Sequence, residues 1–137
     1  MFRGEKCQNK DGIGYGEFTQ IKIEHLSKIF GMHLAVTQAV IKKHKFFSRI
    51  YRYIDATAGR GFTPDGIVGS PLVFLEQAEK SSFKLEYSAD LIEREQSNIT
   101  GLRQTVVESA SIHSWLCSNV QYHHGDYKNI IPSLVKR

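Results

Sequence analysis

The sequence predicts an α/β fold, with a small, mostly parallel sheet between layers of helices. Three short apolar segments with strand-like composition lie at residues 52–57, 84–89 and 119–124. Between them, apolar residues recur at helical spacing. The predicted order is one helix, followed three times by a strand and a helix. Alternation of this kind favours parallel strands joined by right-handed crossovers.

The N-terminal part predicts a helical lead-in after an irregular arm. Residues 1–16 contain four glycines, whereas Thr19 can cap a helix with a broad apolar face. Gly31 could divide this helix in two. We expect a single domain over residues 17–137, with the lead-in at 17–48 and the sheet with its helices at 49–137.

Start and stop signals mark the helices that follow the strands. Ser70 and Pro71 begin a helix, because serine caps well and proline at the first helical position loses no hydrogen bond. A second helix runs from Glu93 to about residue 109. The last begins at Tyr127 and is expected to be interrupted by Pro132. The stripe expected to face the core in the second helix consists of Ile99, Leu102 and Val106.

Composition limits the class of protein. The chain has 137 residues, 41% of them hydrophobic and 23% charged, which suits one globular domain. It has no apolar run long enough to span a membrane, and its N-terminus lacks the apolar region of a secretory signal. Cys7 and Cys117 do not form a paired motif. We therefore expect a reduced, cytoplasmic protein without a membrane span.

Positive charge is concentrated in the first half of the chain. The net charge is +4, yet residues 1–60 carry 11 basic and 5 acidic side chains, while residues 61–137 carry 7 and 9. Aromatic residues interleave with basic ones between Lys42 and Arg52, a pattern that could contact nucleic acid or a protein partner. The same basic residues would also be found at a solvated helix end, where lysines suit the helix dipole, and we favour that interpretation. The candidate contact residues are Lys42, Lys43, Lys45 and Arg49.

The segment YIDATAGRG, residues 53–61, indicates a ligand-binding turn. Asp55 follows an apolar strand, and Gly59 and Gly61 would let a ligand approach the backbone. Asp90 and Asp126 follow the next two expected strands. Because parallel strands end at one edge of a sheet, we expect the three carboxylates to converge there. Aspartate at a strand end is also a common helix cap or turn former, and this alternative stays open at each position.

The chemistry of these groups suits a nucleoside with a charged tail. A carboxylate at Asp90 can accept hydrogen bonds from ribose hydroxyls, and one at Asp126 can accept from an exocyclic amine of adenine. Asp55 would attract an ammonium group. A dinucleotide fingerprint requires a third glycine, which is missing after Gly61, and the chain has no P-loop motif. The pattern therefore favours S-adenosylmethionine over NAD.

YIDATAGRG followed by DGIVGSPLVFLEQA resembles the three-Cys-motif partner proteins, a bacterial family related to class I S-adenosylmethionine-dependent methyltransferases. The resemblance covers roughly residues 15 to 126 and includes Asp90 and HHGD at 123–126. It implies part of a Rossmann-like fold with S-adenosylmethionine as the cofactor. The cofactor-binding residues that we expect are Asp55, Ala58, Gly59, Gly61, Asp90, Leu91 and Asp126.

The chain departs from a class I methyltransferase in length, because it ends after three of seven expected strands. We expect a longer protein, a partner or a homo-oligomer to complete the sheet, since the first strand would otherwise be an open edge. No catalytic base can be nominated, and His123 and His124 point to opposite strand faces, which disfavours a metal site. Alternatives are a catalytically inactive partner module docking through the basic lead-in and, less favoured, a nicotinamide-dependent oxidoreductase.

Overall fold

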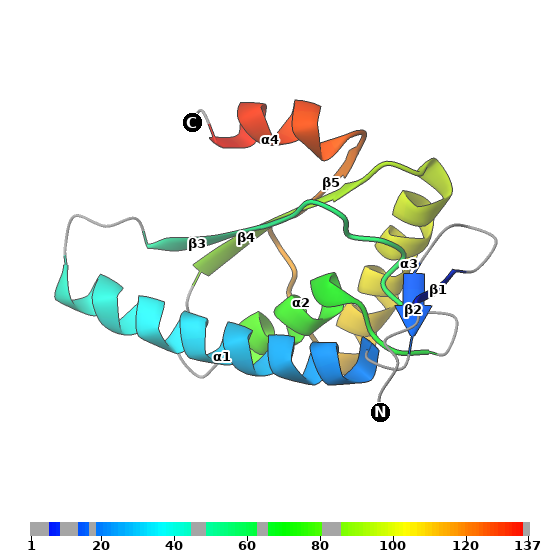
Figure 1. Cartoon of the computed structure of the whole chain (residues 1–137). Helices are drawn as coiled ribbons and strands as arrows, with labels where there is room; N and C mark the ends of the chain where they lie inside the picture. Colours follow the sequence, from blue (N-terminus) through cyan, green and yellow to red (C-terminus); the bar gives the residue numbers. More distant parts are fainter. Residues whose placement is uncertain are drawn as a thin grey trace.

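The structure, a computed structural model, has a three-stranded sheet with helices on both of its faces (Figure 1). The description covers residues 6–8, 14–16, 19–44, 49–62, 66–80 and 86–135, with side chains from residue 21 onward.

The central sheet is open and entirely parallel. It consists of β3 (Ile50–Asp55), β4 (Glu86–Glu93) and β5 (Val120–His124), in that spatial order. In the register, Asp55 lies opposite Leu91, and Glu93 lies opposite His124. All three strands therefore end at the same edge of the sheet.

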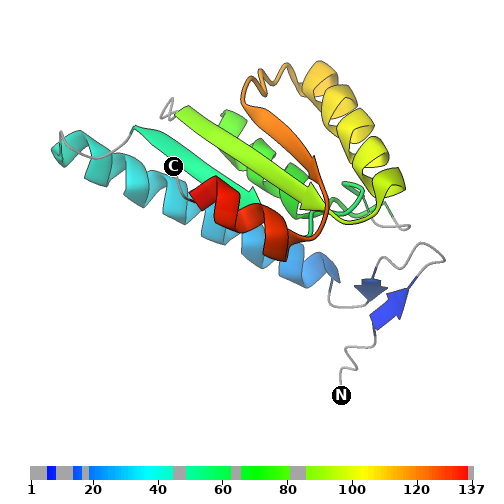
Figure 2. The ribbon, with the colours of Figure 1, turned by 90° about the horizontal axis from the view of Figure 1, so that it is seen from above.

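Helices form a layer on each face of the sheet. Figures 1 and 2 show α1 (Thr19–Lys43), α2 (Ser70–Lys80) and α3 (Gln96–His113) on one face and α4 (Tyr127–Val135) on the other. The α/β class and the parallel strand order are thus confirmed, and the arrangement is compatible with a Rossmann-like fold.

The core lies between the sheet and the layer that contains α2. Phe74 of α2 is fully buried, and its ring stacks on Tyr53 of β3 with 4.1 Å between ring centroids. Phe30 of α1 meets Phe74 edge to face at 5.5 Å, and Tyr51 and Tyr87 also contact the Phe74 ring. One side chain thus joins α1, α2, β3 and β4, and the expected stripe of α3 is buried as well.

The N-terminal arm is more ordered than expected. The sequence suggested irregular structure over residues 1–16, whereas β1 (Lys6–Gln8) pairs antiparallel with β2 (Gly14–Gly16). Two of the four glycines that suggested irregular structure, Gly14 and Gly16, are residues of β2 itself.

The lead-in is one continuous helix of 25 residues, so the expected break at Gly31 is wrong. A Cβ atom at residue 31 would lie 3.2 Å from Gln77 Oε1 of α2. Glycine therefore lets the two helices approach closely at this point, and their packing outweighs the low helix propensity of the residue.

The largest difference from the sequence-based expectation lies at the end of β4. The strand was expected to end before Asp90, but it continues to Glu93, and α3 begins at Gln96. Leu91 and Ile92 are fully buried in the sheet, and this tertiary burial extends the strand. The helix α3 continues to His113 and ends at Ser114, whose φ is +58°.

The last helix continues through Pro132 to Val135, so the expected interruption is also wrong. Proline removes the hydrogen bond that its own N–H would have made to Lys128 and crowds that carbonyl, so other contacts must hold the helix here. At the end of the helix, Arg52 Nη2 of β3 donates to the carbonyl oxygen of Leu134 at 3.0 Å. The Leu134 side chain is buried, and the hydrogen bond from Arg52 of the sheet to its carbonyl holds the end of α4 in place.

Both outer strands have an unpaired edge in the described part of the chain, as expected for the first strand, β3. Of the described helices, none has the length and apolar character required to cross a membrane.

Candidate ligand-binding edge of the sheet

Three acidic residues lie where the three parallel strands end. Asp55 is the last residue of β3, Glu93 is the last residue of β4, and Asp126 follows β5 after one glycine. The N–H of Gly125 donates to the Glu93 carbonyl at 3.0 Å, which ties the end of β5 to that of β4. An acidic residue therefore stands at the end of each strand, with Glu93 instead of the expected Asp90 at the end of β4.

Asp55 is buried and orders the turn that follows β3. Its Oδ1 accepts from the Thr57 N–H at 3.1 Å, and its Oδ2 accepts from the Tyr53 hydroxyl at 2.6 Å and the Ser70 hydroxyl at 2.5 Å. Burial and the neighbouring Asp55 charge raise the pKa of Tyr53 far above its ordinary value. Ser70, expected as a helix cap, thus connects the start of α2 to the end of β3.

The glycine turn is closed by backbone hydrogen bonds. The Ala58 N–H donates to the Ile92 carbonyl at 2.9 Å, and the Gly69 N–H donates to the Gly61 carbonyl at 2.6 Å. Gly59 and Gly61 have φ values of +71° and +100°. A Cβ on Gly59 would meet no atom of the described residues within 4 Å, which leaves room for the close approach of a ligand.

Glu93 is the residue that the sequence-based prediction missed. Its Oε2 accepts from the Glu95 N–H at 2.6 Å and from Asn98 Nδ2 at 3.4 Å. Its Oε1 has no hydrogen-bond partner among the described residues. The buried Asn98 Oδ1 also has no hydrogen-bond partner among the described residues. The signal in the sequence was the apolar pair Leu91 and Ile92 after Asp90, which continues the strand.

Asp126 begins α4. Its Oδ1 accepts from the Lys128 N–H at 2.8 Å, and its carbonyl oxygen accepts from Asn129 at 3.0 Å and Ile130 at 3.2 Å. Its Oδ2 has no hydrogen-bond partner in the described part of the chain. Asp126 therefore caps the helix and still has one oxygen available for a ligand.

Asp90 lies inside β4, three residues before its end, and is buried. His123 Nε2 is 2.8 Å from its Oδ1, and Arg52 Nη2 is 3.9 Å from its Oδ2. Arg52 also binds the end of α4, so this cluster belongs to the contact between the sheet and α4. The expectation that Asp90 follows the strand is wrong, because Glu93 occupies the strand end from which a role in ribose binding was inferred.

Two further expected cofactor-binding residues face inward. Leu91 is fully buried in the core, so its side chain supports the sheet. Ala58 is buried as well, and its N–H is used in the hydrogen bond to β4. Both residues therefore support the turn from its buried side, whereas Gly59 lies on the side that a ligand would reach.

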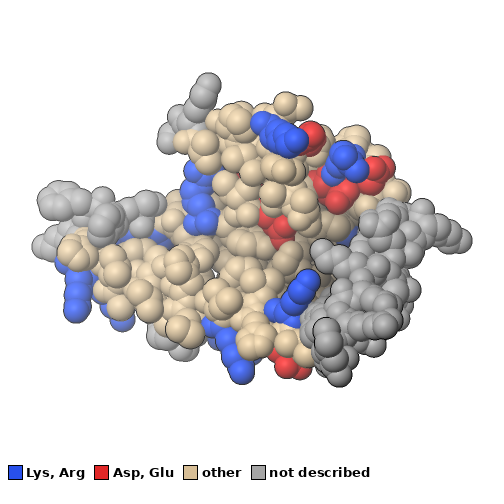
Figure 3. Space-filling view, in the orientation of Figure 1, with Lys and Arg blue, Asp and Glu red and all other residues tan. Residues whose placement is uncertain are grey.

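The basic residues lie at the other end of β3 from Asp55. Lys42 and Lys43 are exposed at the end of α1, and Arg49 is exposed just before β3 begins, while Lys45 lies outside the described residues. Figure 3 shows Lys and Arg side chains in separate patches, several of them along α1. The basic segment and the acidic strand ends are therefore two separate surfaces.

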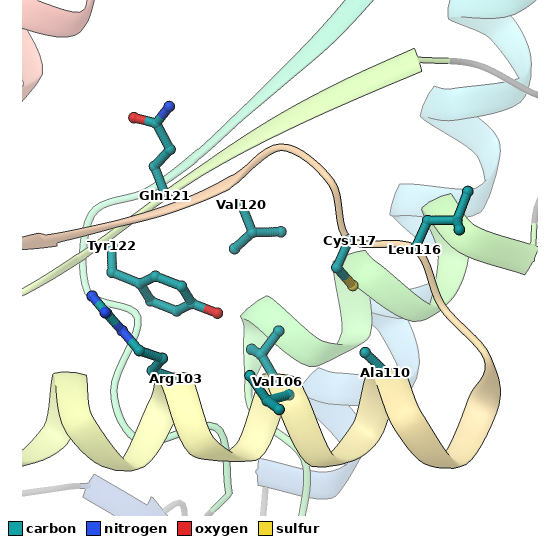
Figure 4. A pocket seen from close by; sticks show the side chains of 9 residues that line it. Arg103, Val106, Ala110, Leu116, Cys117, Val120, Gln121 and Tyr122 are labelled. Carbon is teal, nitrogen blue, oxygen red and sulfur yellow. The ribbon is translucent and has the colours of Figure 1, made fainter.

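A pocket of about 620 Å³ lies between α3 and β5 (Figure 4). The guanidinium of Arg103 lies over the ring of Tyr122, 4.8 Å from its centroid. Burial, followed by the influence of Cys117, raises the pKa of Tyr122 to about 12. The lining includes none of the residues expected at the cofactor site, so this pocket is distinct from the edge that carries the acidic residues.

Within the described residues, no group of three or more His, Cys, Asp and Glu side chains could hold a metal ion. No protein-family model matches the chain, and no curated protein is significantly similar to it.

Proposed function

We propose that the carboxyl edge of the sheet binds S-adenosylmethionine and that the chain is methyltransferase-like. The observation that carries this proposal is the arrangement of Asp55, Glu93 and Asp126 at the ends of three adjacent parallel strands. In open α/β sheets, ligands bind outside the carboxyl ends of the strands. The resemblance of the glycine turn to the three-Cys-motif partner proteins supports the choice of ligand.

Each part of the ligand has a suitable group at this edge. Ribose hydroxyls would donate to Glu93 Oε1, and the exocyclic amine of adenine would donate to Asp126 Oδ2, because both oxygens have no partner among the described residues. The methionine tail would lie against Gly59, where a Cβ would meet no atom of the described residues within 4 Å. Asp55, held by three hydrogen bonds, would contribute its charge and the shape of the turn.

S-adenosylmethionine supplies an activated methyl group, so the protein would need chiefly to hold the ligand and align an acceptor. The acidic residues and the glycine turn at this edge would bind and orient the adenosyl ligand. None of them is assigned as a catalytic base. The acceptor would be bound by residues beyond those that form this edge. Methyl transfer is therefore the reaction class that we propose for a complex in which such residues are present.

A second candidate function is a partner module of Rossmann-like fold. The unpaired edge of β3 favours it, because an open strand edge can pair with a strand of another chain or another copy. The exposed basic residues at the end of α1 provide a second surface for a protein or nucleic acid. The two candidates are compatible, since a partner could also supply the acceptor-binding residues.

Calorimetric titration of the folded chain with S-adenosylhomocysteine tests the proposal, with NAD as the control ligand. We expect saturable binding of S-adenosylhomocysteine and no binding of NAD, whose pyrophosphate requires the missing glycine pattern. Equal binding of both ligands, or binding of NAD alone, would contradict the assignment. Failure to bind either ligand by a folded chain would leave the partner module as the better account.

A further inference from the structure

The helix α1 is apolar on two sides. Its inner side packs against α2 and the aromatic cluster through Leu34, which is 2% exposed. Its outer side carries Ile29, Met32 and Val36, which are 59%, 69% and 60% exposed. Figure 1 shows α1 as the outermost helix of its layer, with one side turned away from the sheet. A surface helix normally presents polar residues on that side.

The exposed apolar residues form a narrow stripe along the helix axis. Ile29, Met32 and Val36 are separated by three and four residues, exposed Ala39 continues the series, and exposed Val40 lies beside it. This spacing matches the a and d positions of a heptad, and a stripe of this width is typical of a seam between two helices. The stripe from Ile29 to Ala39 is about 16 Å long, and in the same register the neighbouring a and d positions hold His25 and Lys43.

The stripe is flanked by positive charge. If Ile29 is placed at position a, Lys28 and Lys42 are at g positions, and both are exposed. The whole helix contains four lysines and one acidic residue, Glu24. Neither Lys28 nor Lys42 has an ion-pair partner among the described residues. A partner that matched this surface would therefore present acidic residues beside an apolar seam.

We propose that the outer face of α1 binds an amphipathic helix of a protein partner, with apolar a and d residues and acidic flanks. A second copy fits less well, because paired α1 helices would bring their lysines together with almost no acidic counterpart. Nucleic acid fits less well too, since cations lie beside the stripe and the apolar residues occupy its centre. The inference specifies the partner surface of the second candidate function and does not depend on the adenosyl ligand.

Fluorescence anisotropy with two labelled synthetic peptides tests the inference. Both are helical, about three heptads long, with leucine at a and d, and they differ in having Glu or Lys at e and g. We expect the full chain to bind the acidic peptide at least about tenfold more tightly than the basic one, with affinity falling as salt is raised. Lys28→Glu combined with Lys42→Glu should reverse this preference.

The apolar seam is tested with Met32→Gln combined with Val36→Gln, and the matched control is Val107→Gln at an exposed site of α3. The seam variant should weaken binding of the acidic peptide at least about tenfold, because it removes the a and d contacts. The control should bind like the unaltered chain, and neither variant should change the titration with S-adenosylhomocysteine. Circular dichroism confirms that each variant remains folded.

Three results would overturn the inference. One is equal affinity for the two peptides, since charge would then not select the partner. Another is a stable dimer in analytical ultracentrifugation that Met32→Gln with Val36→Gln dissociates, because a second copy would then occupy the face. The third is peptide binding that survives in the seam variant but is displaced by duplex DNA, which would assign the face to nucleic acid.

Discussion

Gly59 and Gly61 have similar backbone conformations but different surroundings, and this difference separates binding from stability. Replacing Gly59 by Ala should cost about 1 kcal/mol of folding free energy through strain alone and should weaken adenosyl-ligand binding, because the new Cβ enters the open side of the turn. Replacing Gly61 by Ala should destabilise more, since its Cβ would lie 2.9 Å from Thr105 Cγ2.

Denaturant unfolding and ligand titration of both variants measure these effects. The assignment of the ligand side of the turn would be contradicted if Gly59→Ala bound S-adenosylhomocysteine as tightly as the unaltered chain. It would also be contradicted if Gly61→Ala were the milder of the two in unfolding.

At the residue scale, the sequence indicates most of the acidic edge. Asp55 and Asp126 stand beside unambiguous turn signals, the glycine turn and Gly125, so that their places at strand ends could be predicted. Glu93 could not be placed in the same way. It is followed by residues compatible with a helix start, and the apolar pair Leu91 and Ile92 before it suits a helix as well as a strand, so that the structure was needed to decide between them.

At the scale of elements, Phe74 packs α2 against the sheet and against α1. The ring is fully buried and contacts aromatic rings of α1, β3 and β4. Phe74→Ala should therefore destabilise the chain by about 3–5 kcal/mol, whereas Val107→Ala, at an exposed position of α3, should change stability by less than about 0.5 kcal/mol.

Chemical denaturation of the two variants, followed by circular dichroism, tests this role. A loss of less than about 1 kcal/mol in Phe74→Ala would mean that the aromatic cluster does not hold the two layers together.

The two helix breaks that were wrongly expected lie where tertiary packing outweighs the low helix propensity of a single residue. Gly31 and Pro132 are poor helix residues, yet α1 and α4 pass through both. Contact with Gln77 of α2 accounts for the first, and the anchoring of the end of α4 by Arg52 accounts for the second. Neither contact can be deduced from the sequence near the residue itself, because each partner comes from another element.

At the scale of the whole molecule, the stability of the fold should depend on pH in the alkaline range. Burial raises the pKa values of Tyr53, Tyr87 and Tyr122 above the ordinary 10.0, in the case of Tyr122 to about 12. The unfolded chain would lose these protons near pH 10, while the folded chain would keep them. Stability should therefore be unaffected by these groups below pH 10 and should fall as the pH rises from 10 through about 12.

Denaturant midpoints measured from neutral to alkaline pH test this dependence. Tyr122→Phe should show a smaller loss than the unaltered chain, because one of the raised groups is removed. A midpoint that stays constant above pH 10 would contradict the raised pKa values of these buried hydroxyls.

The topology of the molecule was the most predictable feature. The alternation of strands and helices indicated a parallel sheet with its first strand at an edge, and the structure confirms both. The antiparallel pair β1 and β2 was not indicated, because a run of glycines is compatible with both irregular structure and a tight reversal. The apolar outer face of α1 could be found only when the inner face had been identified from its contacts.

Titration of Glu93→Gln and Asp90→Asn with S-adenosylhomocysteine tests the central claim most directly. Both variants remove one carboxylate from β4, at its end and three residues before it. We predict that Glu93→Gln lowers affinity at least about tenfold, because it loses a charged acceptor of ribose hydroxyls. Asp90→Asn should keep its affinity and lose thermal stability, since Arg52 and His123 would lose their partner. Loss of affinity in Asp90→Asn alone would contradict the proposed site.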